Sequence, residues 1–133
     1  MSAFEVTLVL DIDAADGVVR SALADGGFGV MTEIDIAGAF AQKLGVERPA
    51  LRILGACNPQ FAYEAISIDP RASLALPCNV VLEDVGGATL VRVVDPRDLM
   101  TDIDLNELAD RVASQLAQVT AALQRRPEAA PAM

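Results

Sequence analysis

Segments of strand periodicity alternate with segments of helical periodicity in the first half of the chain. Polarity alternates over residues 4–10, which is typical of a half-buried strand. The next segment predicts a helix that Asp13 caps, with Asp16 near the positive end of its dipole. We expect Gly26 and Gly27 to end this helix, because glycine readily adopts the backbone conformation that follows a last helical turn.

A second strand and a short helix are predicted next, over residues 28–35 and 36–44. The even-numbered residues of the strand are expected on one face and the odd-numbered residues on the other. Asp35 is the expected N-cap of the helix, and Gly45 is expected to end it. The helix has an apolar residue at every fourth position, namely Ile36, Phe40 and Leu44.

The central segment predicts a third strand and a third helix. The strand covers residues 51–56. The helix starts at Asn58 and Pro59, because asparagine is a good N-cap and proline suits the first helical position. The pair Asp69–Pro70 ends the helix, since a residue before proline avoids helical backbone.

Two further strands are predicted over residues 79–84 and 89–94, joined by a tight hairpin at Gly86–Gly87. The resulting order is β-α-β-α-β-α-β-β-α, and the strands are half polar. This pattern predicts a two-layer α+β sandwich, in which one mixed sheet of about five strands has helices mainly on one face. Residues 1–124 are expected to form this single domain.

The longest apolar repeat predicts the C-terminal helix. Asp104 is the expected N-cap, and Glu107 completes a capping box three residues later. Apolar residues then recur three and four positions apart, at Leu105, Leu108, Val112, Leu116, Val119 and Leu123. Residues 125–133, rich in proline and alanine, are expected to be a frayed tail.

Composition and charge exclude several classes of partner. Apolar residues make up 53% of the 133-residue chain, which is enough for a core, and nineteen acidic against ten basic residues give a net charge of -9. This charge repels phosphate backbones and anionic lipid surfaces, so neither nucleic acid nor membrane is an expected partner. The start of the chain lacks a signal-peptide pattern, and no apolar run is long enough to cross a bilayer, so a cytoplasmic location is expected.

The two cysteines each precede an asparagine, in a chain without histidine. Cys57 comes just before a predicted helix N-terminus, where free N–H groups and the helix dipole would stabilise a thiolate. A free cysteine also serves as a small buried apolar residue, which is the alternative interpretation. If the strands next to Cys57 and Cys78 are antiparallel, both thiols lie at one edge of the sheet. If the strands are parallel, the thiols are too far apart for a disulfide or a shared metal.

Other side chains offer little chemistry. No metal site is expected, because structural zinc takes about four ligands from Cys and His and this chain offers two. Without histidine, a Ser-His-Asp relay is excluded. Arg52 and Arg92 lie in the middle of predicted strands, and we expect them to form ion pairs with Glu33 or Glu83 rather than to hold an anionic ligand.

The segment from Gly55 to Pro96 has a specific succession of motifs. It starts with G-x-C-N-P, continues with D-P and L-P-C-N-V, and ends with a second D-P after the hairpin. This succession resembles a bacterial and archaeal family catalogued as domain of unknown function 302, DUF302. The resemblance implies a compact α+β domain that tends to form homodimers and has no assigned activity.

The recurring motif positions are the candidate binding residues, and they are Gly55, Cys57, Asn58, Pro59, Pro77, Cys78 and Asn79. The first hypothesis is a homodimeric module that binds a small molecule or an anion near the two Cys-Asn turns. One alternative is a thiol enzyme or redox protein with Cys57 as nucleophile and Cys78 as a resolving thiol. The other is a dimer with a purely structural or interaction role. The sequence identifies neither a cofactor nor a catalytic residue.

Overall fold

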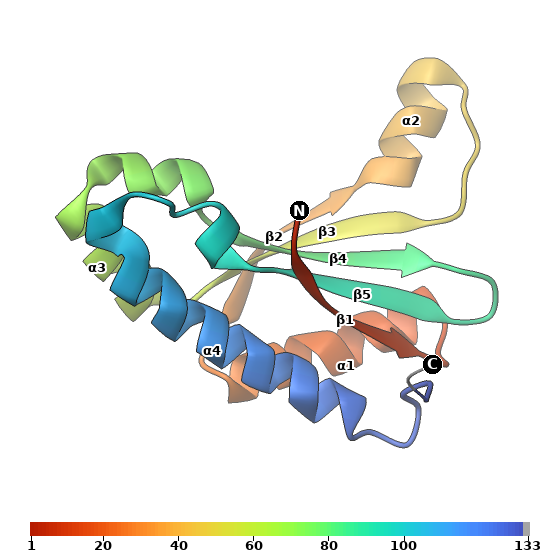
Figure 1. The fold of residues 1–133 in the computed structure, drawn as a ribbon. Coiled ribbons are helices and arrows are strands. Elements are labelled where there is room, and N and C mark those ends of the chain that lie inside the picture. Colours follow the sequence, from red (N-terminus) through yellow and green to blue (C-terminus); the bar gives the residue numbers. More distant parts are fainter. Residues whose placement is uncertain (132–133) are drawn as a thin grey trace.

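A single five-stranded sheet organises the part of the chain that the computed structural model describes, residues 1–131 (Figure 1). Its strands lie in the order β1-β5-β4-β3-β2, and every neighbouring pair is antiparallel. The strands are β1 (Ala3–Leu8), β2 (Gly29–Asp35), β3 (Leu51–Cys57), β4 (Cys78–Asp84) and β5 (Thr89–Val94). The α+β prediction is confirmed, but the sheet is not mixed. The chain crosses from β1 to β2 at the opposite edge, and each later strand up to β5 lies beside the preceding one in the opposite direction.

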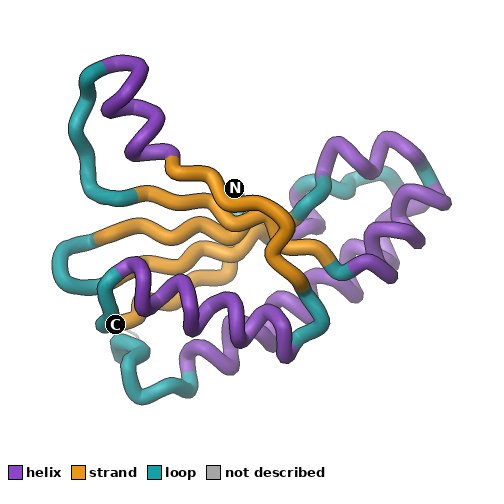
Figure 2. Tube along the Cα trace, turned by 180° about the vertical axis from the view of Figure 1, so that it is seen from behind, coloured by secondary structure: helices purple, strands orange, loops and turns teal. Residues whose placement is uncertain are grey.

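Helices cover one face of this sheet. The described residues form the helices α1 (Ile12–Asp25), α2 (Ile36–Leu44), α3 (Pro59–Ile68) and α4 (Asn106–Gln124), with the 3-10 helices η1 (Pro70–Ala75), η2 (Pro96–Asp98) and η3 (Ile103–Leu105). The helices α1 and α4 lie side by side against the sheet, and α3 lies near one end of α4 (Figures 1 and 2). The other face, called here the open face, has no helix over its middle.

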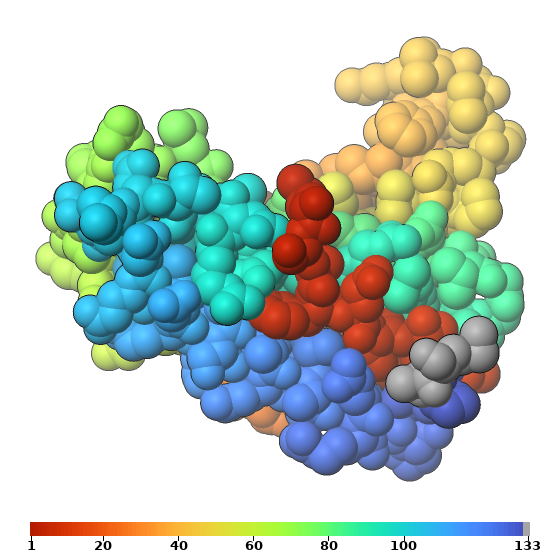
Figure 3. All heavy atoms as spheres, viewed as in Figure 1, coloured from red at the N-terminus to blue at the C-terminus, as the bar shows by residue number. Residues whose placement is uncertain are grey.

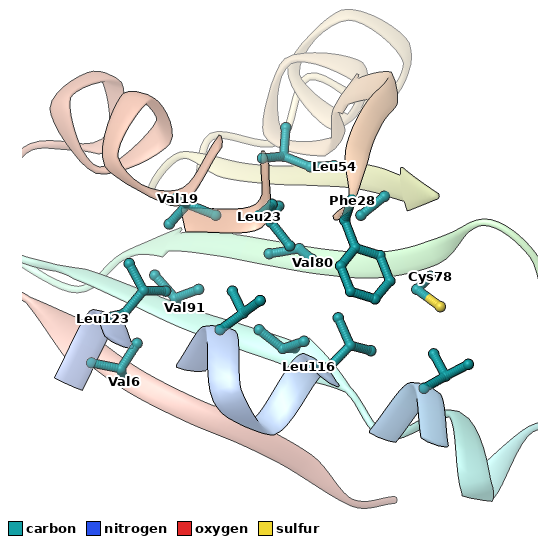
Figure 4. Packing of buried hydrophobic residues seen from close by; sticks show 14 of the residues in the cluster. Val6, Val19, Leu23, Phe28, Leu54, Cys78, Val80, Val91, Leu116 and Leu123 are labelled. Carbon is teal, nitrogen blue, oxygen red and sulfur yellow. The ribbon is translucent and has the colours of Figure 1, made fainter. Parts of the chain in front are cut away.

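The core lies between the sheet and the pair α1 and α4 (Figure 4). Its strand side consists of alternate residues that are fully buried, among them Leu54, Val80, Leu82, Val91 and Val93. The predicted stripe of α4 faces this layer, and Leu116 and Leu123 have no exposed surface. Burial of this apolar surface stabilises the two layers against each other.

Two predicted helix starts are wrong. The N-cap of α1 is Asp11, whose Oδ1 accepts a hydrogen bond from the Ala14 amide at 2.8 Å. Asp13 lies inside the first turn, because the position of α1 is decided by the face it buries on the sheet. The capping box predicted at Asp104 and Glu107 does not form, since η3 precedes α4 and α4 has no side-chain cap. The predicted caps of α2 and α3, Asp35 and Asn58, are confirmed.

A β-bulge changes the two faces of β2 from those predicted. The pairing register between β2 and β3 shifts between Val30 and Thr32. Before the shift Val30 pairs with Ala56, and after it Thr32 pairs with Gly55 and Ile34 with Ile53. Because a bulge adds one residue to one strand only, the side chains that follow it change faces relative to simple alternation. Thr32 and Ile34 therefore lie on the open face, and Glu33 lies on the helical side.

The tail that was expected to fray is bound to the sheet up to residue 130. Val9 donates its amide to the carbonyl of Glu128, and Ala130 donates to the carbonyl of Thr7. These bonds occupy the outer edge of β1, which would otherwise have unpaired backbone groups. Residues 132–133 of the predicted tail lie outside the described residues.

Two projections rise on the side of the open face, at opposite ends of the sheet (Figure 1). The first, called the arm, is residues 36–46, which contain α2. The second, called the lobe, is residues 69–76 and 95–105, which contain the three 3-10 helices. Figure 3 shows a hollow between the arm (orange to yellow) and the lobe (green to cyan), with the red N-terminal residues standing in its middle.

Within residues 1–131, no helix combines the length and the apolar composition that a membrane crossing requires.

Candidate functional site

The two Cys-Asn turns meet at one end of the sheet. The strands β3 and β4 are antiparallel, and their register pairs Ala56 with Cys78 and Gly55 with Asn79. This register selects the antiparallel alternative, in which Cys57 follows directly after the partner of Cys78. Both cysteines are free thiols.

The two cysteines share one small cavity beneath α3. Phe28, Phe61 and Met100 also line this cavity, whose volume is about 10 Å³. Such a volume is that of a single water-sized probe, so a ligand does not fit beside the thiols. Cys78 is 3% exposed and belongs to the apolar core next to Phe28 (Figure 4). Cys78 therefore fills space in the interior, and Cys57 lies half-buried beside it.

The helix N-terminus next to Cys57 does not activate its thiol. Burial raises the pKa of Cys57. Burial, together with a smaller effect of the nearby Cys57, raises the pKa of Cys78 to about 11. The N–H groups at the start of α3 are already bound, because Asn58 Oδ1 accepts from the amides of Gln60 at 3.1 Å and Phe61 at 3.3 Å. The capping side chain thus takes the donors that a thiolate would need.

Both thiols are expected to react slowly with iodoacetamide in the native protein. At pH 8 the raised pKa values leave only a small fraction of thiolate, and Cys78 is also shielded by the core. Alkylation rates measured by mass spectrometry from pH 7 to 10 should be below those of the same cysteines in unfolded protein, and lowest for Cys78. The variants Cys57→Ser and Cys78→Ser assign each rate. A fast native reaction at Cys57 with a midpoint below pH 8 would support the thiol alternative instead.

Asn58 and Pro59 have a local structural role. Asn58 is the N-cap of α3, and Pro59 occupies its first turn. Proline suits this position because its missing N–H would have no partner inside the helix. These two motif positions determine where α3 begins, and the Asn58 oxygen is not free to bind a ligand.

Gly55, Pro77 and Asn79 come together on the open face. Asn79 is exposed, and Gly55 pairs with it from β3 and with Thr32 from β2. A methyl group added at Gly55 would overlap Oγ1 of Thr32 and would lie 2.8 Å from Cγ of Pro77. The absence of a side chain at Gly55 therefore lets Thr32 and Pro77 approach each other over the sheet. Pro77 follows a cis peptide bond.

Beside the row of paired residues that contains Thr32, Gly55 and Asn79 lies a second row on the open face, which changes from apolar to charged residues across the sheet. The register aligns Ile34, Ile53, Val81, Arg92 and Glu5 across the five strands. Ile34 lies on the edge strand β2 and is 49% exposed, and the next two residues of the row, Ile53 and Val81, are apolar. The open face thus offers an apolar surface next to the amide of Asn79 and the hydroxyl of Thr32.

The arginines of the strands form ion pairs, as predicted. On the open face Arg92 contacts Glu83 at 2.8 Å and Glu5 at 3.1 Å, and Arg48 also contacts Glu83 at 2.8 Å. Hydrogen bonds from Arg92 and Arg48 lower the pKa of Glu83. No unpaired cation on these strands is therefore available for an anion.

On the helical side the main partner of Arg52 is Asp16, whereas Glu33 or Glu83 was the predicted partner. Arg52 Nη1 lies 2.7 Å from Asp16 Oδ2, whereas its distance to Glu33 is 3.5 Å. Arg20 also bonds Asp16 from the next turn of α1. The spacing of Asp16 and Arg20, four residues apart, is a signal that could have indicated this cluster. Because every charge in it has a partner, the cluster has a structural role.

The described residues offer no cluster of metal ligands. Among residues 1–131, no set of three or more Cys, Asp or Glu side chains is arranged to hold a metal ion.

Comparison with known proteins adds the family and the fold. The crystal structure of an uncharacterized conserved DUF302 protein from Bacillus stearothermophilus has 24% sequence identity and a TM-score of 0.81, over 91% of this chain and 97% of that chain. No curated protein matches the chain. The family model for the domain of unknown function DUF302 matches residues 4–123. With this match over most of its length, the chain belongs to the DUF302 family.

Proposed function

We propose that this chain is a homodimeric module that binds a small molecule on the open face, beside the two Cys-Asn turns. The observation that carries the proposal is the meeting of Gly55, Pro77 and Asn79 with Thr32 on an uncovered surface. Because Gly55 has no side chain, Thr32 and Pro77 can approach each other closely above it. The side-chain amide of Asn79 and the hydroxyl of Thr32 then lie next to the apolar residues of the neighbouring row. A few polar groups set in an apolar surface are typical of small-molecule sites.

The ligand proposed is uncharged. The open-face cations Arg48 and Arg92 are paired with Glu83 and Glu5, so an anion would have to displace a carboxylate. The net charge of -9 repels anions at longer range. A neutral molecule that can both donate and accept hydrogen bonds suits Asn79, because the side-chain amide of Asn79 has an NH2 donor and a carbonyl acceptor.

A second copy is proposed because one chain leaves the site open. The cavity at the cysteines, about 10 Å³, cannot hold a ligand, and the surface around Asn79 has no opposite wall. The helix α2 has no buried residue, although six of its nine residues are apolar. An isolated helix of this length is marginal in water, so a partner that covers it would stabilise it.

Uncharged aromatic and amide fragments are expected to shift the backbone NMR signals of Thr32, Gly55 and Asn79. The variant Asn79→Ala should weaken binding of these fragments by about tenfold, the effect of one lost hydrogen bond with its partner left unsatisfied. Asn106→Ala is the matched control, since Asn106 is also exposed but lies at the start of α4. Fragments that bind Asn79→Ala as well as the wild type, or that shift only residues of the lobe, would contradict this site.

A further inference from the structure

The arm differs in charge from the rest of this acidic chain. Lys43 is the only charged residue between positions 36 and 46, and it is also the only lysine in the sequence. It is exposed and takes part in none of the salt bridges within residues 1–131. Next to it are the exposed apolar side chains of Phe40, Leu44 and Val46. The arm is thus an apolar surface with one positive charge.

The lobe has the opposite charge and a matching groove. Its residues 69–76 and 95–105 contain five aspartates and two arginines, a net charge of -3. A groove of about 260 Å³ opens in it, lined by the apolar residues Leu74, Ala75, Leu99, Met100 and Leu105 and by the charged Asp102 and Arg71. Leu74 is 89% exposed, which is unusual for a large apolar side chain. This groove has room for a bulky side chain, because its volume is several times the roughly 30 Å³ that a water molecule occupies.

From this complementarity we propose that the arm of one chain docks in the groove of the lobe of a second chain. Phe40 and Leu44 enter the apolar groove, and Lys43 lies near Asp102, the aspartate that lines it. The inference rests on the proposed function, because it specifies how the two chains of the dimer meet. Apolar contact in the centre and opposite charges at the rim are the common composition of protein interfaces.

The positions of arm and lobe permit this contact to be made twice. Both rise on the side of the open face, at opposite ends of the sheet (Figures 1 and 3). When two open faces are turned toward each other by a twofold rotation about an axis perpendicular to the line from arm to lobe, each arm lies opposite the partner's lobe. Such an arrangement is closed and symmetric. The N-terminal residues stand in the hollow between the two projections (Figure 3), so the proposed contacts lie at the two ends of the hollow.

The experiment combines two charged substitutions, one on each side of the contact. Phe40→Asp in the arm and Leu74→Asp in the lobe should each weaken the homodimer by at least about 30-fold, the effect of losing a central apolar contact. Sedimentation equilibrium of each purified variant measures this change. Val85→Asp is the control, because Val85 is exposed on the β4–β5 hairpin outside both projections. Circular dichroism verifies that each variant is folded.

Mixing the two variants separates this interface from others. A Phe40→Asp chain has an intact lobe and a Leu74→Asp chain has an intact arm, so their heterodimer regains one unaltered contact. The mixture should therefore associate more tightly than either variant alone. Suppose that the wild type is a dimer, but Leu74→Asp dimerises as tightly as the wild type or the mixture associates no more tightly than the single variants. The arm–lobe interface is then overturned, while the proposed dimer is not. If the wild type is a monomer at the highest concentration measured, both the dimer and this interface are overturned.

Discussion

Asp16→Asn is expected to lower the free energy of unfolding by about 1.5–3 kcal/mol, because it removes a charge that hydrogen-bonds two arginines at the edge of the core. The side chain of Asp16 is 9% exposed, and its oxygens accept from Arg52 at 2.7 Å and from Arg20. Asparagine has the same shape but no charge, and its amide nitrogen would face a guanidinium. Urea unfolding at pH 7 measures the difference from the wild type.

Asp13→Asn provides the matched control, since Asp13 contacts the same Arg52 but its side chain is exposed to solvent. The distance is 3.0 Å, but the Asp13 side chain is 85% exposed. Exposed ion pairs contribute about 0–1 kcal/mol, so this variant should differ little from the wild type. Equal losses for the two variants would show that burial of Asp16 does not strengthen the pair.

The contribution of Asp16 should also depend on pH. Burial by itself raises the pKa of Asp16, but the hydrogen bonds from Arg52 and Arg20 outweigh it, and the pKa lies below the usual 3.8. A lowered pKa means that the ionised group stabilises the fold above the unfolded-state value and that this stability is lost as the pH falls through the folded-state value. The difference in the free energy of unfolding between the wild type and Asp16→Asn is therefore expected to become smaller below about pH 4. If this difference were unchanged at pH 3, the ionised carboxylate of Asp16 would not be its cause.

Gly55→Val is expected to lower the free energy of unfolding by about 1–3 kcal/mol, although valine normally favours strands. The reason is steric, because a Cβ at this position would overlap Oγ1 of Thr32 and lie 2.8 Å from Cγ of Pro77. The substitution should also move the NMR signals of Thr32 and Asn79, since it separates the groups that form the proposed site. Thermal and urea unfolding measure its effect on stability.

Gly29→Val distinguishes this crowding from a general effect of glycine in strands. Gly29 begins β2, and a Cβ there would meet no atom within 4 Å. Valine at this position should leave the stability unchanged or raise it, because glycine weakens a strand by its backbone entropy. If Gly55→Val were as stable as the wild type, crowding against Thr32 and Pro77 would not be the reason for a glycine at this position.

The local signals in the sequence were sufficient for most elements and for the pairing of arginines with carboxylates. Asn58–Pro59 predicted the start of α3, and Asp35 and Gly45 predicted the two ends of α2. These features depend on neighbouring residues, since a cap binds N–H groups within three positions of itself. The stripe from Leu108 to Leu123 likewise predicted the buried face of α4, because the period of a helix is a local property.

The candidate site was predicted only in part, and the cysteines show why. The motif named seven residues as one group, but the fold divides them. Cys57 and Cys78 line an interior cavity, Asn58 and Pro59 begin α3, and Gly55, Pro77 and Asn79 lie on the open face. The expectation of a stabilised thiolate was physically sound for a free helix N-terminus. The tertiary structure opposes this expectation, because Asn58 binds the N–H groups and burial raises the pKa of Cys57.

By itself the sequence determined the order of the elements, the main apolar stripes, the acidic character and the motif of the family. These follow from periodicity, composition and contacts between near neighbours. Only the tertiary structure decided the direction of β3 against β4, the bulge that turns Ile34 to the open face, and the pairing of Arg52 with Asp16. Each of these depends on which distant segments pack together, and the free energy of that packing is shared among many residues rather than contained in any one segment.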